Sequence, residues 1–323
     1  MAAQAVDFTV SGHVNRAIVF TDVDGASSTT KNKDNGSSGT RVRFTGSSDT
    51  MAGVTAAVNL ELGINPKGKQ KVNNKDEAAD DDDVTVRHSV VSFGGEFGTL
   101  KLGHTGEAAD GATYSDKSGV FGVGHGQEAG DSTAASYTPG MGGSRNAGVH
   151  FSSASFGPAQ LHVSASDGDR FSAKITFGGD AGVASYGGAL AYLDTGDSYQ
   201  EVAGSLGVKL ASGVTFSMAG AGRSDGKEGS FVQSTLGYVF GNNAVAVSWY
   251  GSSDVSVTRD KDTADEMMYV GNGQAIGIGF KHTMPKAGVE IIAAVQQYSA
   301  DETMEGDGDI DDTVAVVGAR IMF

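Results

Sequence analysis

The stretch RFSAKITF, at residues 170–177, has the period that decides the fold. Polar and apolar side chains alternate along it one by one, beginning with Arg170, Phe171, Ser172 and Ala173. Successive side chains of a β-strand point to opposite faces of its sheet. The stretch therefore predicts a strand with one polar and one apolar face.

The same period recurs along the whole chain, for example at residues 54–62 and 202–210. No stretch of comparable length has an apolar stripe at the helical period of 3.6 residues. We therefore expect an all-β chain. The sixteen expected strands are 6–20, 40–47, 52–64, 84–94, 98–104, 144–155, 159–167, 170–178, 182–193, 199–210, 214–223, 229–240, 244–255, 273–283, 288–298 and 313–323.

The connections between these strands fall into two alternating classes. Short glycine-rich turns, such as 94–98 and 178–182, alternate with mostly longer polar segments, such as 22–39 and 65–83. Alternation of this kind is typical of an up-and-down antiparallel meander. An even strand number lets the last strand pair with the first, which removes both free edges.

Barrel width decides which solvent each face meets. Sixteen strands enclose a space too wide for side chains to fill. The polar faces must then line water, and the apolar faces must meet lipid. We predict a transmembrane 16-stranded antiparallel up-and-down β-barrel, formed by a single domain over residues 6–323.

Composition excludes several other classes of protein. A formal net charge of −16 argues against a nucleic-acid partner, which would require concentrated Lys and Arg. With no cysteine, the chain has no disulfide, thiolate nucleophile or cysteine metal site. No run approaches the roughly 18 apolar residues of a membrane helix. No Ser-His-Asp grouping is recognisable, and we expect no enzymatic activity.

The N-terminal residues 1–5 carry Ala3-Gln4-Ala5, the small-x-small form of a signal-peptidase site. We interpret residues 1–5 as the stump of a removed export signal with an added initiator Met. The alternative is an ordinary flexible N-terminus.

Charged residues are sorted between strands and connections. The acidic residues gather in connections such as 76–83 and 301–312, whereas the polar faces of the strands are mostly basic. This distribution predicts a basic-walled tube beneath an acidic rim. The residues expected to line the lumen are Glu61, Lys101, Arg170, Lys174 and Arg320.

Alternating carboxylates at Asp307, Asp309 and Asp311 are similar to part of a calcium-binding loop. No Glu occupies the twelfth position that such a loop requires. We therefore expect loosely bound Ca²⁺ at the acidic rim in preference to a dedicated site, and no other cofactor.

Five segments of the chain resemble the general porins of Gram-negative outer membranes in their order and spacing. They are SGHVNRAIVF (11–20), TRVRFTGSSDTMAGVTAAVNLELG (40–63), FGGEFGTLKLGH (93–104), SRNAGVHFSSASFGPAQLHVSAS (144–166) and VGARIMF (317–323). The resemblance implies a homotrimer in contact with lipid and lipopolysaccharide, which passes small hydrophilic solutes and ions by passive diffusion. It also implies that a long third loop, about 104–143, folds into the pore.

The resemblance further implies which residues surround the narrowest part of the pore. Asp116 is the first candidate on the loop because Val120 occupies the place of the usual carboxylate, before the retained Phe121. The other candidate loop acids are Glu107, Asp110, Glu128 and Asp131. The basic wall would contain His13, Arg41, Arg43, Arg87 and Arg145.

Two arginines share the parity of apolar residues in their strands. Arg145 shares its parity with the apolar Val149 and Phe151, so a bulge would have to turn it into the lumen, or the assignment is wrong. Arg16 lies on the apolar face of its strand, where we expect a subunit contact or the headgroup zone.

The resemblance also concerns the last residue of the chain. The family's terminal Phe is read by the barrel-insertion machinery, which makes Phe323 an expected assembly signal.

Three functions remain open: a passive diffusion channel, a substrate-specific channel, and a structural or adhesive surface barrel. A basic constriction favours anions, whereas an acidic rim concentrates cations within a Debye length of about 8–10 Å. Because the net charge is −16, we expect the channel to prefer cations.

Overall fold

The computed structural model describes residues 7–23, 28–34, 38–49, 53–64, 84–114, 116–120, 132, 134–138, 140–196, 198–224, 229–259, 267–302 and 309–323, apart from the side chains of 257–259, 267–269 and 302. The strands are β1 (Asp7–Val23), β2 (Thr29–Lys33), β3 (Arg41–Asp49), β4 (Thr55–Ile64), β5 (Val84–Gly95), β6 (Gly98–Gly106), β7 (Arg145–Ser153), β8 (Ala159–Ser166), β9 (Arg170–Asp180), β10 (Ala184–Asp194), β11 (Gln200–Leu210), β12 (Val214–Ser224), β13 (Gly229–Phe240), β14 (Asn243–Arg259), β15 (Met267–Met284), β16 (Val289–Glu302) and β17 (Ile310–Met322). Two single-turn 3₁₀ helices are η2 (Ala134–Tyr137) and η3 (Pro285–Ala287). Within the described residues, no helix is long and apolar enough to cross a membrane.

The strands form one closed antiparallel sheet. From β3 to β17, each strand pairs with the next strand in sequence. On β1, residues 13–23 pair with β17 and residues 7–13 pair with β3, so the first and last strands close the ring. The fold is the expected closed 16-stranded up-and-down barrel, although 17 strand segments are labelled.

The additional segment arises because the second barrel strand consists of two pieces. β2 pairs with residues 17–21 of β1, and β3 pairs with residues 7–13 of β1. Between them, the Thr40 hydroxyl donates to Asp34 Oδ1 at 3.1 Å and accepts from the Asn15 amide at 3.1 Å. We expected residues 29–33 in a loop, which is wrong. Their polar sequence TTKNK has no alternation, and their pairing with β1 forms the strand.

Several strands are longer than the sequence period indicates. β14 and β16 continue to residues 259 and 302, and β15 and β17 begin at residues 267 and 310. These extensions lack a strict alternation of polar and apolar residues, as in SADE at 299–302 and MMYV at 267–270, so the two-residue period does not reveal them. Backbone pairing between neighbouring strands continues through these extensions.

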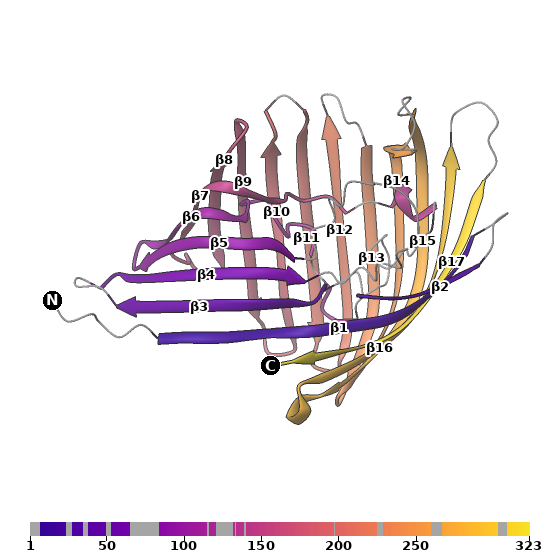
Figure 1. The fold of residues 1–323 in the computed structure, drawn as a ribbon, viewed down its shortest axis with the longest axis horizontal. Coiled ribbons are helices and arrows are strands. Elements are labelled where there is room, and N and C mark those ends of the chain that lie inside the picture. The colour runs from indigo at the N-terminus through magenta and orange to yellow at the C-terminus, as the bar shows by residue number, and fades with distance from the viewer. Residues whose placement is uncertain are drawn as a thin grey trace, which may run out of the picture.

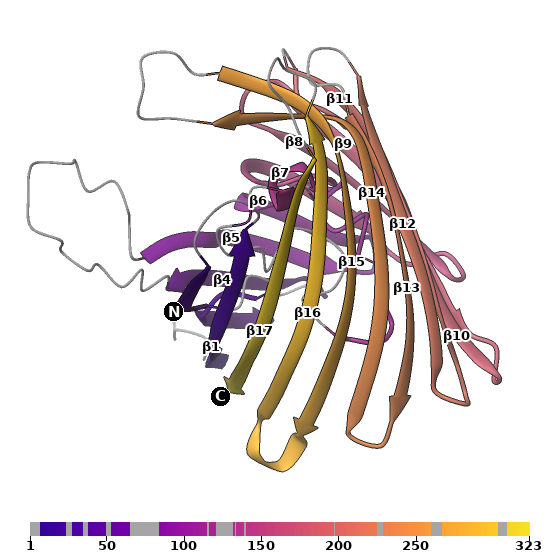
Figure 2. The ribbon, with the colours of Figure 1, turned by 90° about the vertical axis from the view of Figure 1, so that its right-hand side faces the viewer.

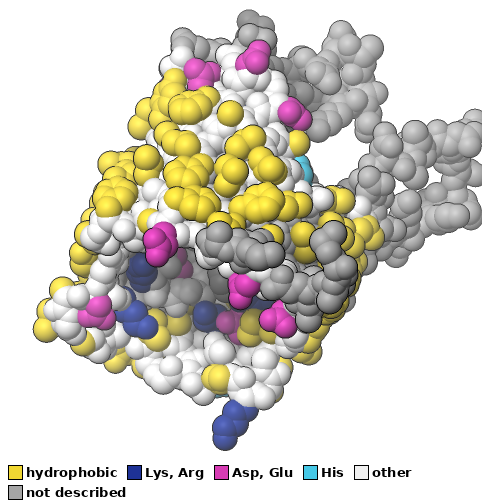
Figure 3. Space-filling model, turned by 90° about the vertical axis from the view of Figure 1, so that its left-hand side faces the viewer, with side chains coloured by type: hydrophobic (Ala, Val, Ile, Leu, Met, Phe, Trp, Pro, Cys, Tyr) yellow, Lys and Arg dark blue, Asp and Glu magenta, His cyan; other side chains and the backbone are white. Residues whose placement is uncertain are grey.

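The register separates an apolar outer face from a polar inner face. Ile175 of β9 is opposite Leu190 of β10, and their side chains are 36% and 60% exposed on the outer face. The next pair, Lys174 and Ala191, lies on the inner face. Figure 3 shows Lys and Arg side chains within a hollow of the molecule and hydrophobic side chains gathered on the surface outside it.

Strand tilt explains the appearance of the two walls. In Figure 1, β3 to β6 run across the view, while β10 to β15 run along it. Barrel strands tilt by roughly 35–45° from the axis, so strands of opposite walls cross steeply. Figure 2 shows β13 to β17 side by side, with tight turns that join β13 to β14 and β15 to β16 at their lower ends. One of these turns, η3, ends at Gly288 with a left-handed φ of 63°.

Candidate functional site

Glu61 of β4 is the centre of an ion-pair cluster on the inner face. Its side chain is fully buried. Its Oε1 accepts from Arg41 Nη1 at 3.3 Å and from Arg87 Nε at 2.9 Å, and its Oε2 accepts from Arg43 Nε at 2.7 Å. One carboxylate thus faces three guanidinium groups, and the cluster retains an excess of positive charge.

Strand register brings these residues together. Arg43 is opposite Glu61 in the β3–β4 pair, and Arg41 is opposite Gly63. In the β4–β5 pair the register shifts, with Glu61 opposite His88 and Leu62 opposite Val86. The shift leaves Arg87 as the extra residue of a β-bulge, which turns its side chain toward Glu61.

The bulge corrects one detail of the sequence interpretation. Simple parity places Arg87 on the same face as Thr85 and Ser89. In the structure Ser89 is opposite Leu60, which is 39% exposed on the outer face. Arg87 and His88 instead both lie near Glu61, because the bulge reverses the parity beyond it.

His13 and Arg320 lie beside this cluster but have other partners. His13 is opposite Arg41 on β1, and its Nε2 lies 3.0 Å from the Gly39 carbonyl. Arg320 Nε donates to Glu290 Oε2 at 2.8 Å, and Lys281 Nζ lies 3.8 Å from Glu290 Oε1. Sequence reasoning missed Glu290, although its parity on β16 could have revealed it.

Arg145 is the first residue of β7 and is opposite Gly106. No register shift occurs along the β6–β7 pair, so no bulge re-aims it. Gly106 abuts the Asp110 side chain, so Arg145 lies near Asp110 at the start of the connection between β6 and β7. Among the described residues, its buried Nε has no hydrogen-bond partner.

The start of the connection between β6 and β7 contacts the inner face of β8 and β9. Arg170 Nε donates to Glu107 Oε1 at 2.5 Å, and Lys174 Nζ donates to the Asp110 carbonyl at 2.5 Å. The amides of Ala108 and Ala109 donate to inner-face hydroxyls, those of Ser164 and Ser172, at 2.9 and 3.1 Å. Lys101 also lies on this face, opposite His150.

Later parts of the same connection contact strands far away in the sequence. Val120 packs with Ala244 and Ala246 of β14. Asp312 of β17 accepts from Ser132 Oγ at 2.7 Å and from the Ala134 amide at 3.0 Å. The connection therefore contacts both β8–β9 and β14–β17.

The candidate loop acids have different surroundings. The Asp116 carboxylate accepts from the Ser118 amide at 2.8 Å and the Gly119 amide at 3.0 Å, so it stabilises its own turn. Burial raises the pKa of the Asp110 carboxyl, while Arg145 and Lys174 act in the opposite direction. The candidates Phe121, Glu128 and Asp131 lie outside the described residues.

The acidic candidates for calcium are only partly described. Asp309 and Asp311 are exposed, and Asp307 lies outside the described residues. Within the described part of the chain, no group of three or more His, Cys, Asp or Glu side chains is placed to hold a metal ion. Loose Ca²⁺ binding at the rim stays a prediction.

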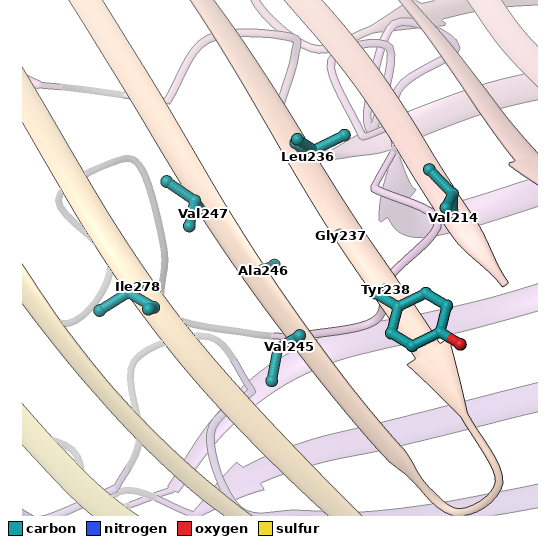
Figure 4. A pocket seen from close by; sticks show the side chains of 8 residues that line it. All are labelled: Val214, Leu236, Gly237, Tyr238, Val245, Ala246, Val247 and Ile278. Atoms are coloured by element: carbon teal, nitrogen blue, oxygen red, sulfur yellow. The ribbon is translucent and has the colours of Figure 1, made fainter.

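A separate apolar groove of about 310 Å³ lies on the outer face of β12 to β15 (Figure 4). Its largest lining side chains are those of Leu236, Tyr238, Val247 and Ile278, all of which are at least 45% exposed. It lies on the opposite face from the ion-pair cluster and has no part in it.

Comparisons with known proteins concern the family and the fold of the chain. A family profile described as Gram-negative porin matches residues 1–320. A search of curated proteins gave no match. Many solved structures share the fold, and three of them illustrate it.

An anion-selective porin from Comamonas acidovorans is 16% identical with a TM-score of 0.65, over 99% of this chain and 100% of that chain. The outer membrane channel DcaP of Acinetobacter baumannii is 15% identical with a TM-score of 0.64, over 99% of this chain and 98% of that chain. OmpT of Vibrio cholerae, in its trimer form, is 10% identical with a TM-score of 0.62, over 99% of this chain and 100% of that chain. At these identities the likeness concerns the fold, whereas the profile match concerns the family. The chain belongs to the Gram-negative porin family and is a β-barrel of the bacterial outer membrane.

Proposed function

We propose that the chain forms a water-filled channel for passive diffusion of small hydrophilic solutes and ions, and that this channel prefers anions. Membership of the porin family supports a channel. The observation that carries the anion preference is the charge of the inner face around Glu61 and Asp110.

Basic side chains outnumber acidic ones in this sector. Among its described residues, the acidic side chains are Glu61, Glu107 and Asp110. The basic side chains are Arg41, Arg43, Arg87, Lys101, Arg145, Arg170 and Lys174. Walls of low dielectric concentrate the field of such an excess within a passage, which attracts anions.

This preference is opposite to the one expected from the net charge. The acidic residues of the connections at 76–83 and 301–312 contribute strongly to the total of −16. Salt screens charges at the mouth of a channel beyond about 8–10 Å, so we propose that the net charge has less influence on selectivity than the basic sector. The narrowest cross-section has the larger influence on selectivity, and we propose that the basic sector borders it.

We also propose that residues 107–144 lie across the lumen and narrow it. Contacts of this connection with the inner faces of both β8–β9 and β14–β17 support the proposal. The passage would then run between residues 107–120 and the wall that carries Arg41, Arg43 and Arg87. Residues 104–106, which we expected in the loop, belong to β6.

Assembly as a homotrimer is part of the proposal. OmpT of Vibrio cholerae has been solved in a trimer form. In this chain, the outer-face Arg16 pairs with Asp34 at 3.1 Å. An arginine that faces lipid at mid-depth costs about 2–4 kcal/mol, so a protein contact suits this position better. Outer-membrane lipid, lipopolysaccharide and the barrel-insertion machinery are the other proposed partners.

Planar-bilayer recording across a KCl gradient tests the function. We expect ohmic conductance steps in groups of three and a reversal potential whose sign indicates that Cl⁻ is more permeant than K⁺. A greater permeability of K⁺ would contradict the anion preference. Insertion without conductance would favour a structural or adhesive barrel, and saturable block by one solute would favour a substrate-specific channel.

A further inference from the structure

Tyr114 is an exposed aromatic residue in an unusual place. The other exposed large hydrophobic residues of the described chain lie on the outer face, in tight turns or at the C-terminus. Tyr114 is 69% exposed and lies in the connection whose start contacts the inner face of β8 and β9. Tyr114 follows a turn of its own, but that turn lies in the connection against the inner face and not between two strands at the end of the barrel.

The backbone before Tyr114 forms a tight turn. The Tyr114 amide donates to the Gly111 carbonyl at 3.1 Å and closes a tight turn. Gly111 has a left-handed φ of 75°, and a Cβ atom there would lie 3.3 Å from Tyr114 Cδ2, so the ring covers this glycine. The neighbouring Thr113 is buried, and its hydroxyl donates to the Met141 carbonyl at 2.8 Å.

The ring lies among the charges of the basic sector. Surrounding protein is the largest cause of the raised pKa of the Tyr114 phenol, and the Asp110 carboxylate is the second. Arg145 and Arg87 act in the opposite direction. Arg145 is opposite Gly106, which abuts the Asp110 side chain, and Gly142 abuts Thr113, so Arg145 lies beside the turn that carries Tyr114.

We propose that Tyr114, together with Arg87 and Arg145, recognises small anions that carry a planar apolar body, of which aromatic carboxylates are the simplest class. This inference rests on the proposed anion-preferring channel. A guanidinium group binds a carboxylate through two parallel hydrogen bonds. The Tyr114 ring can stack on the aromatic body of the same solute, in an offset arrangement that aromatic pairs prefer.

Arg145 suits this role because no protein carboxylate is its ion-pair partner among the described residues. Its buried Nε has no hydrogen-bond partner within the described residues. Arg87 has Glu61 as a partner at 2.9 Å, but it shares that carboxylate with two other arginines. A solute carboxylate would therefore meet guanidinium groups that protein carboxylates neutralise incompletely.

The test compares reversal potentials of the assembled protein in planar bilayers with potassium salts of chloride, acetate, cyclohexanecarboxylate and benzoate. Cyclohexanecarboxylate has nearly the size of benzoate but no planar ring. We expect Tyr114→Leu to lower the permeability of benzoate relative to chloride by about two- to tenfold, the size of one aromatic contact. The relative permeabilities of acetate and cyclohexanecarboxylate should change little.

Tyr114→Phe keeps the ring and should keep the benzoate preference. Tyr186→Leu, on the outer face of β10, is the matched control and should leave all ratios unchanged. An unchanged benzoate ratio in Tyr114→Leu overturns the inference, as does an equal loss for cyclohexanecarboxylate. Wild-type cation preference in KCl would instead overturn the proposed function. Unaltered chloride conductance steps in Tyr114→Leu show that the variant is folded.

Discussion

Glu61 neutralises part of the arginine charge on the inner face of the barrel. It is fully buried, whereas its partners Arg41, Arg43 and Arg87 are 19%, 44% and 25% exposed. A buried carboxylate is tolerated only with close hydrogen-bonding partners. The three guanidinium groups supply these partners and still reach the water of the inner face.

Replacing this carboxylate should raise anion preference and lower stability. In Glu61→Gln, three guanidinium groups repel one another around a neutral amide. We expect a higher Cl⁻/K⁺ permeability ratio and a loss of about 1–3 kcal/mol in unfolding free energy. The loss is smaller than the 3–5 kcal/mol of a fully buried pair because the arginines reach water. Reversal potentials and urea unfolding in lipid vesicles measure the two effects.

Glu201→Gln is the control for this substitution. Glu201 is also buried, but among the described residues its ion pair is with Arg223 alone, whose Nε donates at 2.8 Å. We expect a comparable loss of stability with a smaller rise in the permeability ratio. Equal ratios in the two variants would show that the charge at Glu61 has no special influence on selectivity.

Asp110 should make selectivity depend on pH. Its pKa is raised by burial, so it becomes neutral at a higher pH than the ordinary value of about 3.9. Acidification removes one negative charge from a basic sector, and the Cl⁻/K⁺ ratio should begin to rise above that pH. Reversal potentials recorded over a pH series measure this rise.

Asp110→Asn should have a higher ratio at neutral pH and should lack this part of the pH dependence. Asp116→Asn is the control, because the Asp116 carboxylate accepts hydrogen bonds within its own turn. Identical pH profiles for wild type and Asp110→Asn would contradict the assignment.

At the scale of elements, the two-residue period predicts most of the barrel and fails where pairing is irregular. Lys174 and Arg320 lie on the inner face, as alternation predicts. Arg87 reaches Glu61 through a bulge, and Arg145 occupies the first position of β7, beside the start of the β6–β7 connection. Parity cannot reveal either arrangement, because a bulge and a strand end depend on the neighbouring strand. β2 was missed for the same reason.

The connection between β6 and β7 has an anchor on β17 that can be tested. Asp312 is buried and accepts hydrogen bonds from Ser132 and Ala134. Asp312→Ala removes both bonds, which contribute about 1.5–3 kcal/mol each when one partner is charged. If the connection narrows the pore, the open-channel current of this variant should fluctuate more than that of wild type.

Asp311→Ala provides a close control. Asp311 is the adjacent residue, but it is exposed on the outer face, opposite Ser299 of β16. Its removal should leave the current noise unchanged. Equal noise in Asp312→Ala and wild type would indicate that this anchor does not restrain the part of the connection that solutes pass.

At the scale of the whole molecule, closure is predictable from strand number, whereas the charge balance of the lumen is not. An even count of alternating strands implies that the first and last strands meet, and β1 pairs with β17. The basic face of each strand is also readable from the sequence. That three arginines meet one glutamate depends on the β3–β4–β5 register, which no single strand specifies.

Phe323 lies where the last strand pairs with the first. Its backbone hydrogen bonds and its side chain can be tested separately with different variants. Its amide donates to the Gly12 carbonyl at 3.1 Å, and its carbonyl accepts from the Gly12 amide at 3.0 Å. Its ring is 61% exposed, so the side chain contributes little packing to the barrel. Phe323→Ala keeps both backbone hydrogen bonds, whereas deletion of Phe323 removes them, at a cost of about 0.5–1.5 kcal/mol for each bond.

If Phe323 is an assembly signal, Phe323→Ala should lower the amount of assembled protein in the outer membrane of cells. The same variant, refolded from purified protein, should have wild-type conductance and nearly wild-type stability. Deletion of Phe323 should lower assembly and also the urea midpoint of the refolded barrel. Ile321→Ala, which removes an outer-face side chain of β17 that is 53% exposed, is the matched control and should assemble better than Phe323→Ala. Equal assembly of wild type and Phe323→Ala would restrict the role of the terminal residue to its two backbone hydrogen bonds.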